Sequence, residues 1–200
     1  MKQKQPYLCR HGFTLIELMV VIAIIAVLAA ISTPMISRAF HSANRARANT
    51  EARSIHNAVM NYLNEYGRFP HGNNPAGNDY RYGTLAGANA ENHQLMNVLR
   101  AIGETTDEPG NDAAGNVNHV NNPRRIVFLE AAEESLSEAT GFNYWDPWEQ
   151  QYEIVVDTNF DGEIDVGGFP EWSGTIENRR VGVWSSGNEV ERQDRHIRTW

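Results

Sequence analysis

The strongest pattern along the chain is an apolar stretch close to its beginning. From Phe13 to Ile31 every residue is apolar except Thr14 and Glu17. A helix rises 1.5 Å per residue, so this stretch predicts a helix of about 28 Å, close to the thickness of the hydrocarbon core of a bilayer. The residues before it include three basic side chains and no acidic one. The positive-inside bias therefore predicts a single-pass protein with a cytoplasmic N-terminus and an exported C-terminal part.

A cleaved signal peptide is the competing interpretation of this pattern, because it also has a basic start and an apolar core. Ala29-Ala30-Ile31-Ser32 gives a weak match to a cleavage site. Glu17 argues against it, because a carboxylate inside a membrane helix costs about 2.5–3.5 kcal/mol on insertion scales. A disposable signal has no reason to keep such a residue, so the pattern favours a retained span.

Helical spacing continues beyond the apolar stretch. No Pro or Gly follows Pro34 until Gly67, and apolar residues recur at helical spacing up to Tyr66. These positions predict one helix of about fifty residues that Pro34 kinks or loosens, because proline removes one intrahelical hydrogen bond. Two separate helices that meet at Pro34 are the alternative. Gly67 is suited to a helix C-cap and Pro70 prevents continuation.

The remaining pattern predicts loops, one short helix and a small sheet. Residues 71–82 and 103–123 are rich in Gly and Asn and predict loops, whereas the spacing of apolar residues predicts a helix over 90–102. Residues 126–138 are compatible with either strand or helix. The segments 152–156 and 181–184 predict antiparallel strands, with a turn at residues 145–148. The fold class is therefore α+β, with the outer half of one protruding helix laid against a three- or four-stranded sheet.

Charge and cysteine content narrow the function classes. The chain has 17 Lys and Arg against 25 Asp and Glu, a net charge of −8. Without the three cations that precede Gly12, the charge is −11, which disfavours binding of nucleic acid through its phosphates. The single cysteine, Cys9, also precedes Gly12, so the rest of the chain cannot form an internal disulfide. The seven histidines are scattered, and no nucleophile elbow or phosphate-binding glycine motif is present, so we expect no enzyme.

The segment between the two predicted strands contains a candidate metal loop. Oxygen-bearing side chains alternate along it, with Gly162 at the sixth position, as in the first nine positions of an EF-hand calcium loop; they are Asp157, Asn159, Asp161, Glu163 and Asp165. Hard oxygen ligands without Cys or clustered His favour calcium over zinc or copper. The twelfth position is Gly168 instead of Glu, so the bidentate ligand is missing. The alternative is an acidic hairpin turn with Asp-Gly at its tip.

The beginning of the chain resembles the prepilin peptidase site of type IV pilins and of the pseudopilins of type II secretion. The residues that carry the resemblance are Gly12-Phe13-Thr14-Leu15-Ile16-Glu17, preceded by a short basic leader and followed by the apolar stretch. The resemblance implies cleavage between Gly12 and Phe13 on the cytoplasmic side, N-methylation of Phe13, and retention of the apolar helix. It also implies that Pro34 marks a segment that bends or melts when filaments pack.

Glu17 has a physical role in such an assembly. The carboxylate of one helix can pair with the α-ammonium group at Phe13 of a neighbour, and each charge compensates the other in a low-dielectric bundle. We therefore expect docking to relieve a cost that the isolated subunit carries. A protonated Glu17 in lipid, or one that reaches toward the cytoplasmic face, is the alternative.

The C-terminal part resembles the major pseudopilins. Asp146-Pro147-Trp148 with Tyr152, and the later Ser185-Ser186-Gly187, match the pattern of that family, as does the Gly-x-Phe-Pro that closes the long helix. The family also implies a calcium-holding loop near the C-terminus. Here Glu189 stands where the family has Asp, and His196 stands where Asp is usual, so Asp194 is the substitute ligand of a weaker second site.

These observations divide the chain into a leader (1–12), a membrane-spanning helix segment (13–33), the outer half of the long helix (34–66) and a globular region (67–200). The globular region has a loop-rich middle (71–140) and a C-terminal sheet (144–200). The resemblance implies a pseudopilin in the bacterial inner membrane, with a periplasmic domain that assembles into a periplasmic filament. Its implied partners are prepilin peptidase, minor pseudopilins, and an inner-membrane platform with its ATPase. A type IV pilin of a surface fibre and a membrane-anchored calcium-binding or hydrolytic domain are the alternatives.

Overall fold

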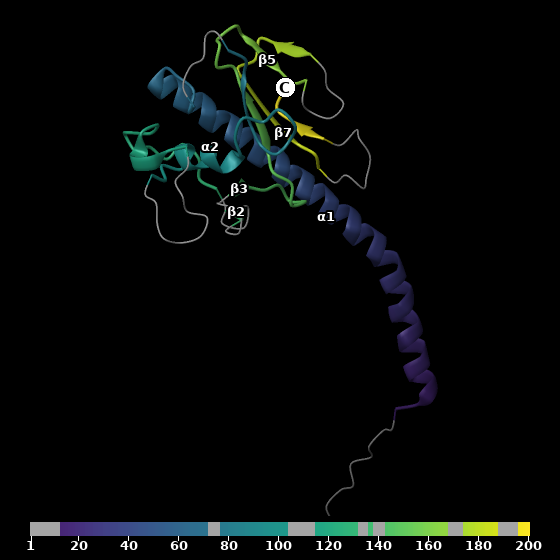
Figure 1. Cartoon of the computed structure of the whole chain (residues 1–200). Coiled ribbons are helices and arrows are strands. Elements are labelled where there is room, and N and C mark those ends of the chain that lie inside the picture. Colours follow the sequence, from purple (N-terminus) through teal and green to yellow (C-terminus); the bar gives the residue numbers. More distant parts are fainter. Residues whose placement is uncertain are drawn as a thin grey trace, which may run out of the picture. The chain divides into compact units, whose positions relative to one another are not determined.

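The structure is a computed structural model, and it describes residues 13–71, 77–103, 115–131, 136–137, 143–167, 174–187 and 196–200. The helical elements are α1 (Leu15–Tyr66), α2 (Asn92–Leu99) and the 3-10 turn η1 (Val117–His119) (Figure 1). The strands are β1 (Tyr80–Tyr82), β2 (Leu136–Ser137), β3 (Asn143–Tyr144), β4 (Glu153–Val156), β5 (Glu163–Asp165), β6 (Thr175–Glu177), β7 (Val181–Ser185) and β8 (Ile197–Arg198). The chain divides into two compact units, with the boundary after Ala43 inside α1.

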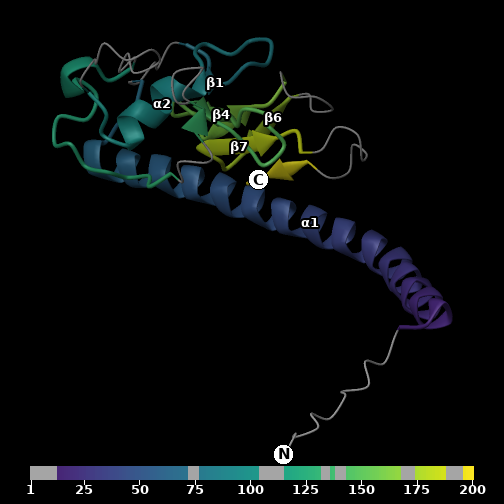
Figure 2. The ribbon, with the colours of Figure 1, turned by 90° about the horizontal axis from the view of Figure 1, so that it is seen from below.

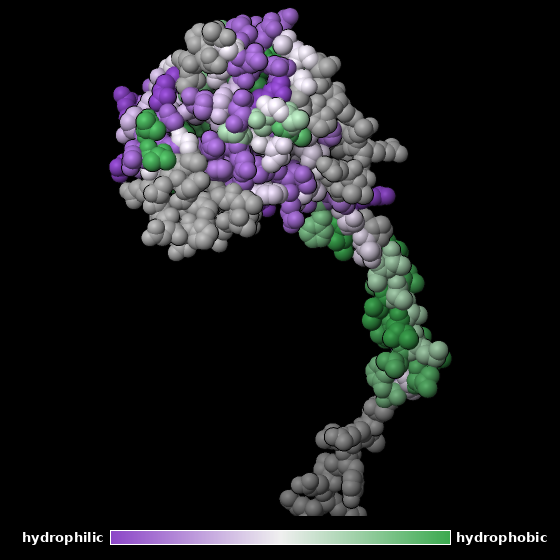
Figure 3. Space-filling view, in the orientation of Figure 1, coloured by the Kyte–Doolittle hydropathy of each residue, from purple (hydrophilic) through white to green (hydrophobic). Residues whose placement is uncertain are grey.

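The first unit exposes apolar side chains along α1. By length and composition, α1 is able to cross a membrane. Its large apolar side chains from Phe13 to Phe40 are all exposed, and Figure 3 shows them covering the visible face of this part of the helix. The hydroxyl groups of Ser32 and Thr33 donate to the carbonyls of Leu28 and Ala29, both at 2.8 Å. These polar side chains are thus satisfied within the helix itself, as an apolar environment requires.

The helix α1 continues through residue 34 and ends where the sequence predicts. Because Leu15–Tyr66 form one helix, the alternative of two helices that meet at Pro34 is wrong. Gly67 has a φ of +65°, and its N–H donates to the carbonyl of Leu63 at 2.8 Å. This is the left-handed C-cap conformation that glycine adopts without steric cost, so the predicted end of the helix is confirmed.

One stripe of α1 forms the base of the core in the second unit. The predicted stripe residues Ile55, Val59, Tyr62 and Leu63 are buried, and Ala48, Ala52 and Ala58 extend the stripe. They pack with buried residues of the sheet, among them Ile154 of β4 and Val183 of β7. Figure 2 shows this part of α1 lying along one face of the sheet. The small alanine side chains leave room for the strands to approach the helix closely.

The main sheet has four antiparallel strands in the order β1-β4-β7-β8. Both predicted strands are confirmed as its centre, because β4 pairs with β7 over four residues from Glu153 opposite Trp184 to Val156 opposite Val181. A second layer, the β5–β6 hairpin, packs its Ile164 with Val155 and Trp184 on the face that points away from α1. A Cβ atom on Gly182 would lie 2.7 Å from the Cδ1 of Ile164, so any larger residue would force Ile164 to move where the hairpin meets β7.

The predicted loop over 71–82 is wrong at its end, because residues Tyr80–Tyr82 form the edge strand β1. Tyr82 lies opposite Ile154 of β4. The outer edge of β1 is closed by Asn89, whose side-chain oxygen accepts the N–H of Arg81 at 2.8 Å and whose N–H donates to the carbonyl of Arg81 at 2.9 Å. Three residues are too few to show a period in the sequence, and the strand is held by partners that are distant along the chain.

Buried asparagines organise the middle of the chain. The predicted helix over 90–102 forms as the shorter α2, and residues 126–129 are neither strand nor helix. The fully buried Asn122 donates to the carbonyls of Val98 and Ile126, both at 2.8 Å. Its oxygen accepts the hydroxyl of Tyr66 at 2.7 Å and the N–H of Ile126 at 3.1 Å. Asn122 therefore ties the end of α1, α2 and the following segment together through hydrogen bonds that regular structure does not supply.

We predict that Asn122→Ala lowers the free energy of unfolding by about 3 kcal/mol, because it leaves several buried donors and acceptors without partners. The measurement is urea unfolding of the purified full chain in detergent, followed by circular dichroism. The matched control is Asn61→Ala, at an exposed position of α1, which should change stability by no more than about 0.5 kcal/mol. Equal losses in both variants would contradict a special role for the buried amide.

Candidate functional sites

The first turn of α1 contains the residues predicted to act in processing and assembly. Gly12 lies outside the described residues, and Phe13 is 76% exposed. The Oε2 atom of Glu17 accepts the N–H of Thr14 at 2.8 Å and its hydroxyl at 2.7 Å. In return, the hydroxyl oxygen of Thr14 accepts the N–H of Glu17 at 3.3 Å. These reciprocal bonds form a capping box, which satisfies donors that a helix start leaves unpaired.

The capping box changes the interpretation of Glu17. The sequence predicts that docking relieves the cost of this carboxylate, whereas within the single chain the carboxylate already accepts two hydrogen bonds. The Thr-x-x-Glu spacing is the sequence signal of such a box and was available from residues 14–17. Pro34 lies within α1, and its side chain is outside the described residues.

The predicted metal loop connects β4 to β5, and a hydrogen bond joins its first residue to its sixth. Asp157 is fully buried, and its Oδ2 atom accepts the N–H of Gly162 at 3.1 Å. Gly162 has a φ of +83°, which fits the sharp turn that the sixth position of a calcium loop needs. The hairpin-tip alternative does not fit, because β4 pairs with β1 and β7, whereas β5 pairs with β6.

Side chains along this loop alternate as acceptors of backbone N–H groups. Asn159 accepts the N–H of Asp161 at 3.2 Å, and Asp161 accepts the N–H of Glu163 at 2.8 Å. Asp165 accepts the N–H of Gly167 at 2.8 Å. The loop is therefore a chain of Asx-type turns that keeps the predicted oxygen ligands in one short segment.

Asp79 joins this loop from the segment before β1, which sequence reasoning missed. Its Oδ2 atom accepts the N–H of Asp165 at 2.5 Å. Arg81 from β1 also contacts Asp165, with its Nη2 atom 3.0 Å from Oδ2 and 2.9 Å from the main-chain oxygen. The loop, Asp79 and Arg81 thus form one polar cluster at the edge of the sheet. No sequence signal marks Asp79, because only the pairing of β1 with β4 brings it here.

The carboxylates of this cluster are crowded. Burial, helped by the nearby charges of Asp157, Asp161 and Asp165, raises the pKa of Asp79 to about 6, although the hydrogen bond from the Asp165 N–H opposes the shift. Burial also raises the pKa of Asp157. The Oδ1 atoms of Asp79 and Asp157 are buried and accept no hydrogen bond from the described residues. Within that part of the chain, no three Asp, Glu, His or Cys side chains converge closely enough to hold a metal ion.

The two C-terminal sequence motifs meet in space. The hydroxyl of Ser185 donates to the Oδ2 atom of Asp146 at 2.5 Å, and the Oδ1 atom of Asp146 accepts the N–H groups of Trp148 and Gln150, both at 2.9 Å. The predicted turn over 145–148 is thereby fixed to the end of β7. Burial raises the pKa of Asp146, although these hydrogen bonds oppose the shift.

The weaker second metal site falls mostly outside the described residues. Glu189 and Asp194, its predicted ligands, are both outside them. His196 is described, and its ring lies edge-on to Trp184 with 5.2 Å between the ring centroids.

Comparisons with known proteins agree with the N-terminal motif. Residues 8–33 match the family described as the prokaryotic N-terminal methylation motif. The chain is 41% identical over 68 residues to the type IV major pilin protein PilE1 of Neisseria gonorrhoeae. The match covers 34% of this chain and 41% of that pilin, so the chain spans about two fifths of the relative's length. No solved structure matches the chain significantly. With its methylation motif, its long apolar helix and its small antiparallel sheets, the chain is type IV pilin-like.

Proposed function

We propose that this chain is a pseudopilin, a subunit of a periplasmic filament that drives type II protein secretion. In this proposal prepilin peptidase cuts between Gly12 and Phe13 and methylates the new N-terminus. The apolar part of α1 holds the subunit in the bacterial inner membrane, with the second unit in the periplasm. The observation that carries the proposal is the methylation motif over residues 8–33, which runs directly into an exposed apolar helix with a single carboxylate near its start.

The bond between Asp146 and Ser185 favours a pseudopilin over a pilin. It joins the Asp-Pro-Trp turn to the Ser-x-Gly segment, the two C-terminal motifs that resemble the major pseudopilins. The lack of any cysteine after Cys9 agrees with this choice, since many pilins close their C-terminal region with a disulfide. The implied partners are minor pseudopilins and an inner-membrane platform with its ATPase, which supplies the work of assembly.

A type IV pilin of a surface fibre is the second candidate, and the match to a type IV major pilin favours it. Deletion of this chain in its own cell separates the two. Loss of protein secretion with surface fibres unchanged supports the pseudopilin, whereas loss of surface fibres with secretion unchanged supports the pilin.

The first test of the proposal is the intact mass and N-terminal sequence of the chain from its native membrane, with and without active prepilin peptidase. We expect a mature chain that begins at N-methylated Phe13 only when the peptidase is active. A chain that keeps Met1 would contradict the proposal and favour an anchored domain. A cut near Ala30 would indicate an ordinary secreted protein.

The role of Glu17 in assembly can be separated from its role in the capping box. Glutamine also serves at the third helical position of a capping box, so Glu17→Gln keeps the cap and removes the charge. We predict normal processing of this variant by intact mass, but about ten-fold less filament in sheared or cross-linked preparations, because the partner of the neighbour's Phe13 ammonium is lost. Thr14→Ala is the control, since it weakens the cap and keeps the carboxylate. A Glu17→Gln variant that assembles normally would contradict the charge-pairing role.

We further propose that the loop from Asp157 to Asp165 binds calcium. The ligands would come from Asp157, Asn159, Asp161, Glu163 and Asp165, with Asp79 beside them. Two observations support the proposal: buried carboxylate oxygens of Asp79 and Asp157 accept no hydrogen bond from the described residues, and burial, together with neighbouring carboxylates, raises the pKa of Asp79. Loops of this type also use amide and main-chain oxygens, which compensates for the scarcity of converging carboxylates. The ion would neutralise the cluster and fix the β5–β6 hairpin to β1.

Calcium should stabilise the purified chain. At ten times its dissociation constant, binding to the folded state alone adds about 1.4 kcal/mol to the free energy of unfolding. We predict that millimolar calcium raises the melting temperature in detergent, that magnesium does so less, and that Asp157→Asn removes most of the effect. Glu149→Gln, at an exposed carboxylate outside the loop, is the control. The calcium proposal fails if the Asp157→Asn variant responds as the unaltered chain does, or if neither responds.

A further inference from the structure

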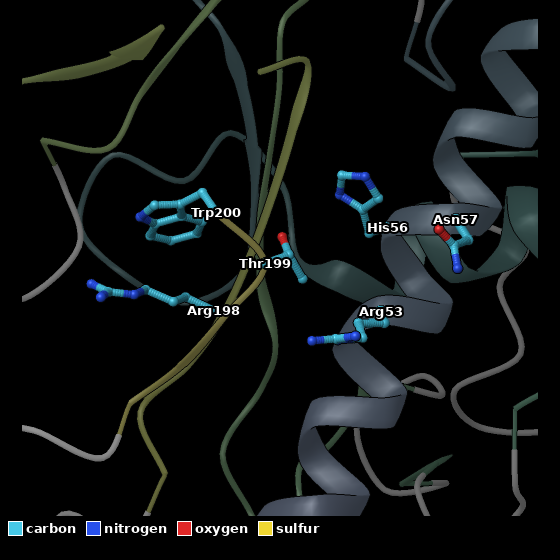
Figure 4. Close-up of a pocket in the computed structure, with 6 residues that line it drawn as sticks. All are labelled: Arg53, His56, Asn57, Arg198, Thr199 and Trp200. Atoms are coloured by element: carbon cyan, nitrogen blue, oxygen red, sulfur yellow. The ribbon is translucent and has the colours of Figure 1, made fainter. Parts of the chain in front are cut away.

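A pocket of about 400 Å³ opens between α1 and the C-terminal strand segment, well apart in sequence from the acidic loop. Its walls come from one turn of α1 and from the last residues of the chain, and they are formed by Arg53, His56, Asn57, Arg198, Thr199 and Trp200. Figure 4 shows Arg53, His56 and Thr199 around the gap between the helix and the strand. In the same view the side chains of Arg198 and Trp200 lie on the other side of the strand.

The chemistry of this pocket suits an anion. On the side of the strand that faces α1, the lining presents the guanidinium of Arg53, the imidazole of His56, the amide of Asn57 and the hydroxyl of Thr199, and none of the six lining residues has a carboxylate side chain. The Nδ1 atom of His56 is buried and makes no hydrogen bond with the described residues. Burial, and after it the positive charge of Arg179, lower the pKa of His56. A further cation thus lies near the pocket, and the site attracts negative charge in a protein that is otherwise acidic.

We infer that this pocket binds a carboxylate side chain of a second copy of this chain. The inference rests on the proposed function, because filament assembly is what brings copies side by side. Charge complementarity identifies the occupant: the chain has 25 acidic residues against 17 basic ones, so its surface offers carboxylates in excess. Exposed examples are Glu130 and Glu149, neither of which forms an ion pair with another described residue.

A contact of this kind is heterologous, because a cationic pocket on one copy meets a carboxylate elsewhere on the next. Such contacts do not pair up and close as a two-fold dimer does, and they generate open helical assemblies when the rotation between copies does not close a ring. The pocket therefore gives the second unit its own directional contact, distinct from the packing of apolar helices. It also gives an acidic subunit a way to offset repulsion between neighbours.

Photo-cross-linking tests the inference directly in the full chain. Asn57 is replaced by benzoylphenylalanine in cells that assemble the filament, and the irradiated membranes are analysed by mass spectrometry. We expect an adduct between two copies, with the photoreactive residue attached close to an Asp or Glu of the second copy. Attachment to a lipid or to an unrelated protein, or the absence of any adduct, would overturn the inference.

Charge variants of Arg53 test whether its positive charge is needed for the contact between copies. We expect Arg53→Glu to reduce the two-copy adduct about ten-fold, and Arg53→Lys to keep it within about two-fold, since the latter retains the charge. Arg45→Glu is the matched control, because Arg45 is also exposed on α1 but does not line the pocket, and it should leave the adduct unchanged. Equal losses of adduct with Arg53→Glu and Arg45→Glu would overturn the inference, because they would indicate a general effect of charge on α1.

Intact mass measured on the same samples separates this inference from the proposed function. If the chain is processed to Phe13 and assembles without the two-copy adduct, the inference about the pocket is wrong and the proposed function stands. A chain that keeps Met1 contradicts the proposed function, whatever the adduct shows.

Discussion

Burial of one stripe of α1 against the sheet is the interaction on which the folded unit depends. The stripe runs from Ala48 to Leu63, and its members are almost completely shielded from solvent. At about 25 cal/mol per Å² of apolar area removed from water, burial of this stripe favours the folded state. The earlier part of the same helix has no such partner among the described residues, and its apolar side chains are exposed. The single helix α1 thus has two different patterns of apolar residues. The first part is apolar on all sides and suits lipid, and the second part has one apolar stripe that suits a protein core.

The patterns that repeat over many residues could be predicted from the sequence. The length of α1, its end at Tyr66 and the central strands β4 and β7 follow from local spacing and residue type. The edge strand β1 could not be predicted, because its formation depends on pairing with β4 and on the side chain of Asn89. The same holds for the segment around Asn122, where order comes from side-chain amides that bond main-chain groups far along the sequence. Such hydrogen bonds produce no regular spacing of residues from which the structure could be predicted.

The candidate sites divide in the same way. The candidate ligands in the loop after β4 could be predicted from the sequence, because a calcium loop places its oxygen ligands at fixed intervals along one segment. The contribution of Asp79 and Arg81 could not be predicted, because only the pairing of β1 with β4 brings them next to the loop. The two C-terminal motifs were recognised separately, and the hydrogen bond from Ser185 to Asp146 gives their joint presence a physical reason. The spacing of Thr14 and Glu17 is enough to predict the capping role of Glu17, whereas the family resemblance bears only on its charge.

The capping box at the start of α1 also bears on how strongly subunits hold each other. In a lone subunit the Glu17 carboxylate already accepts hydrogen bonds from Thr14, so the proposed pairing with a neighbour's ammonium group would exchange one satisfied arrangement for another. The net gain is then the difference between two similar energies, far smaller than the rescue of a bare charge from lipid would supply. In the proposed filament, contacts that are individually weak but numerous would let the polymer grow while subunits are driven into it and return to single subunits in the membrane when that drive stops.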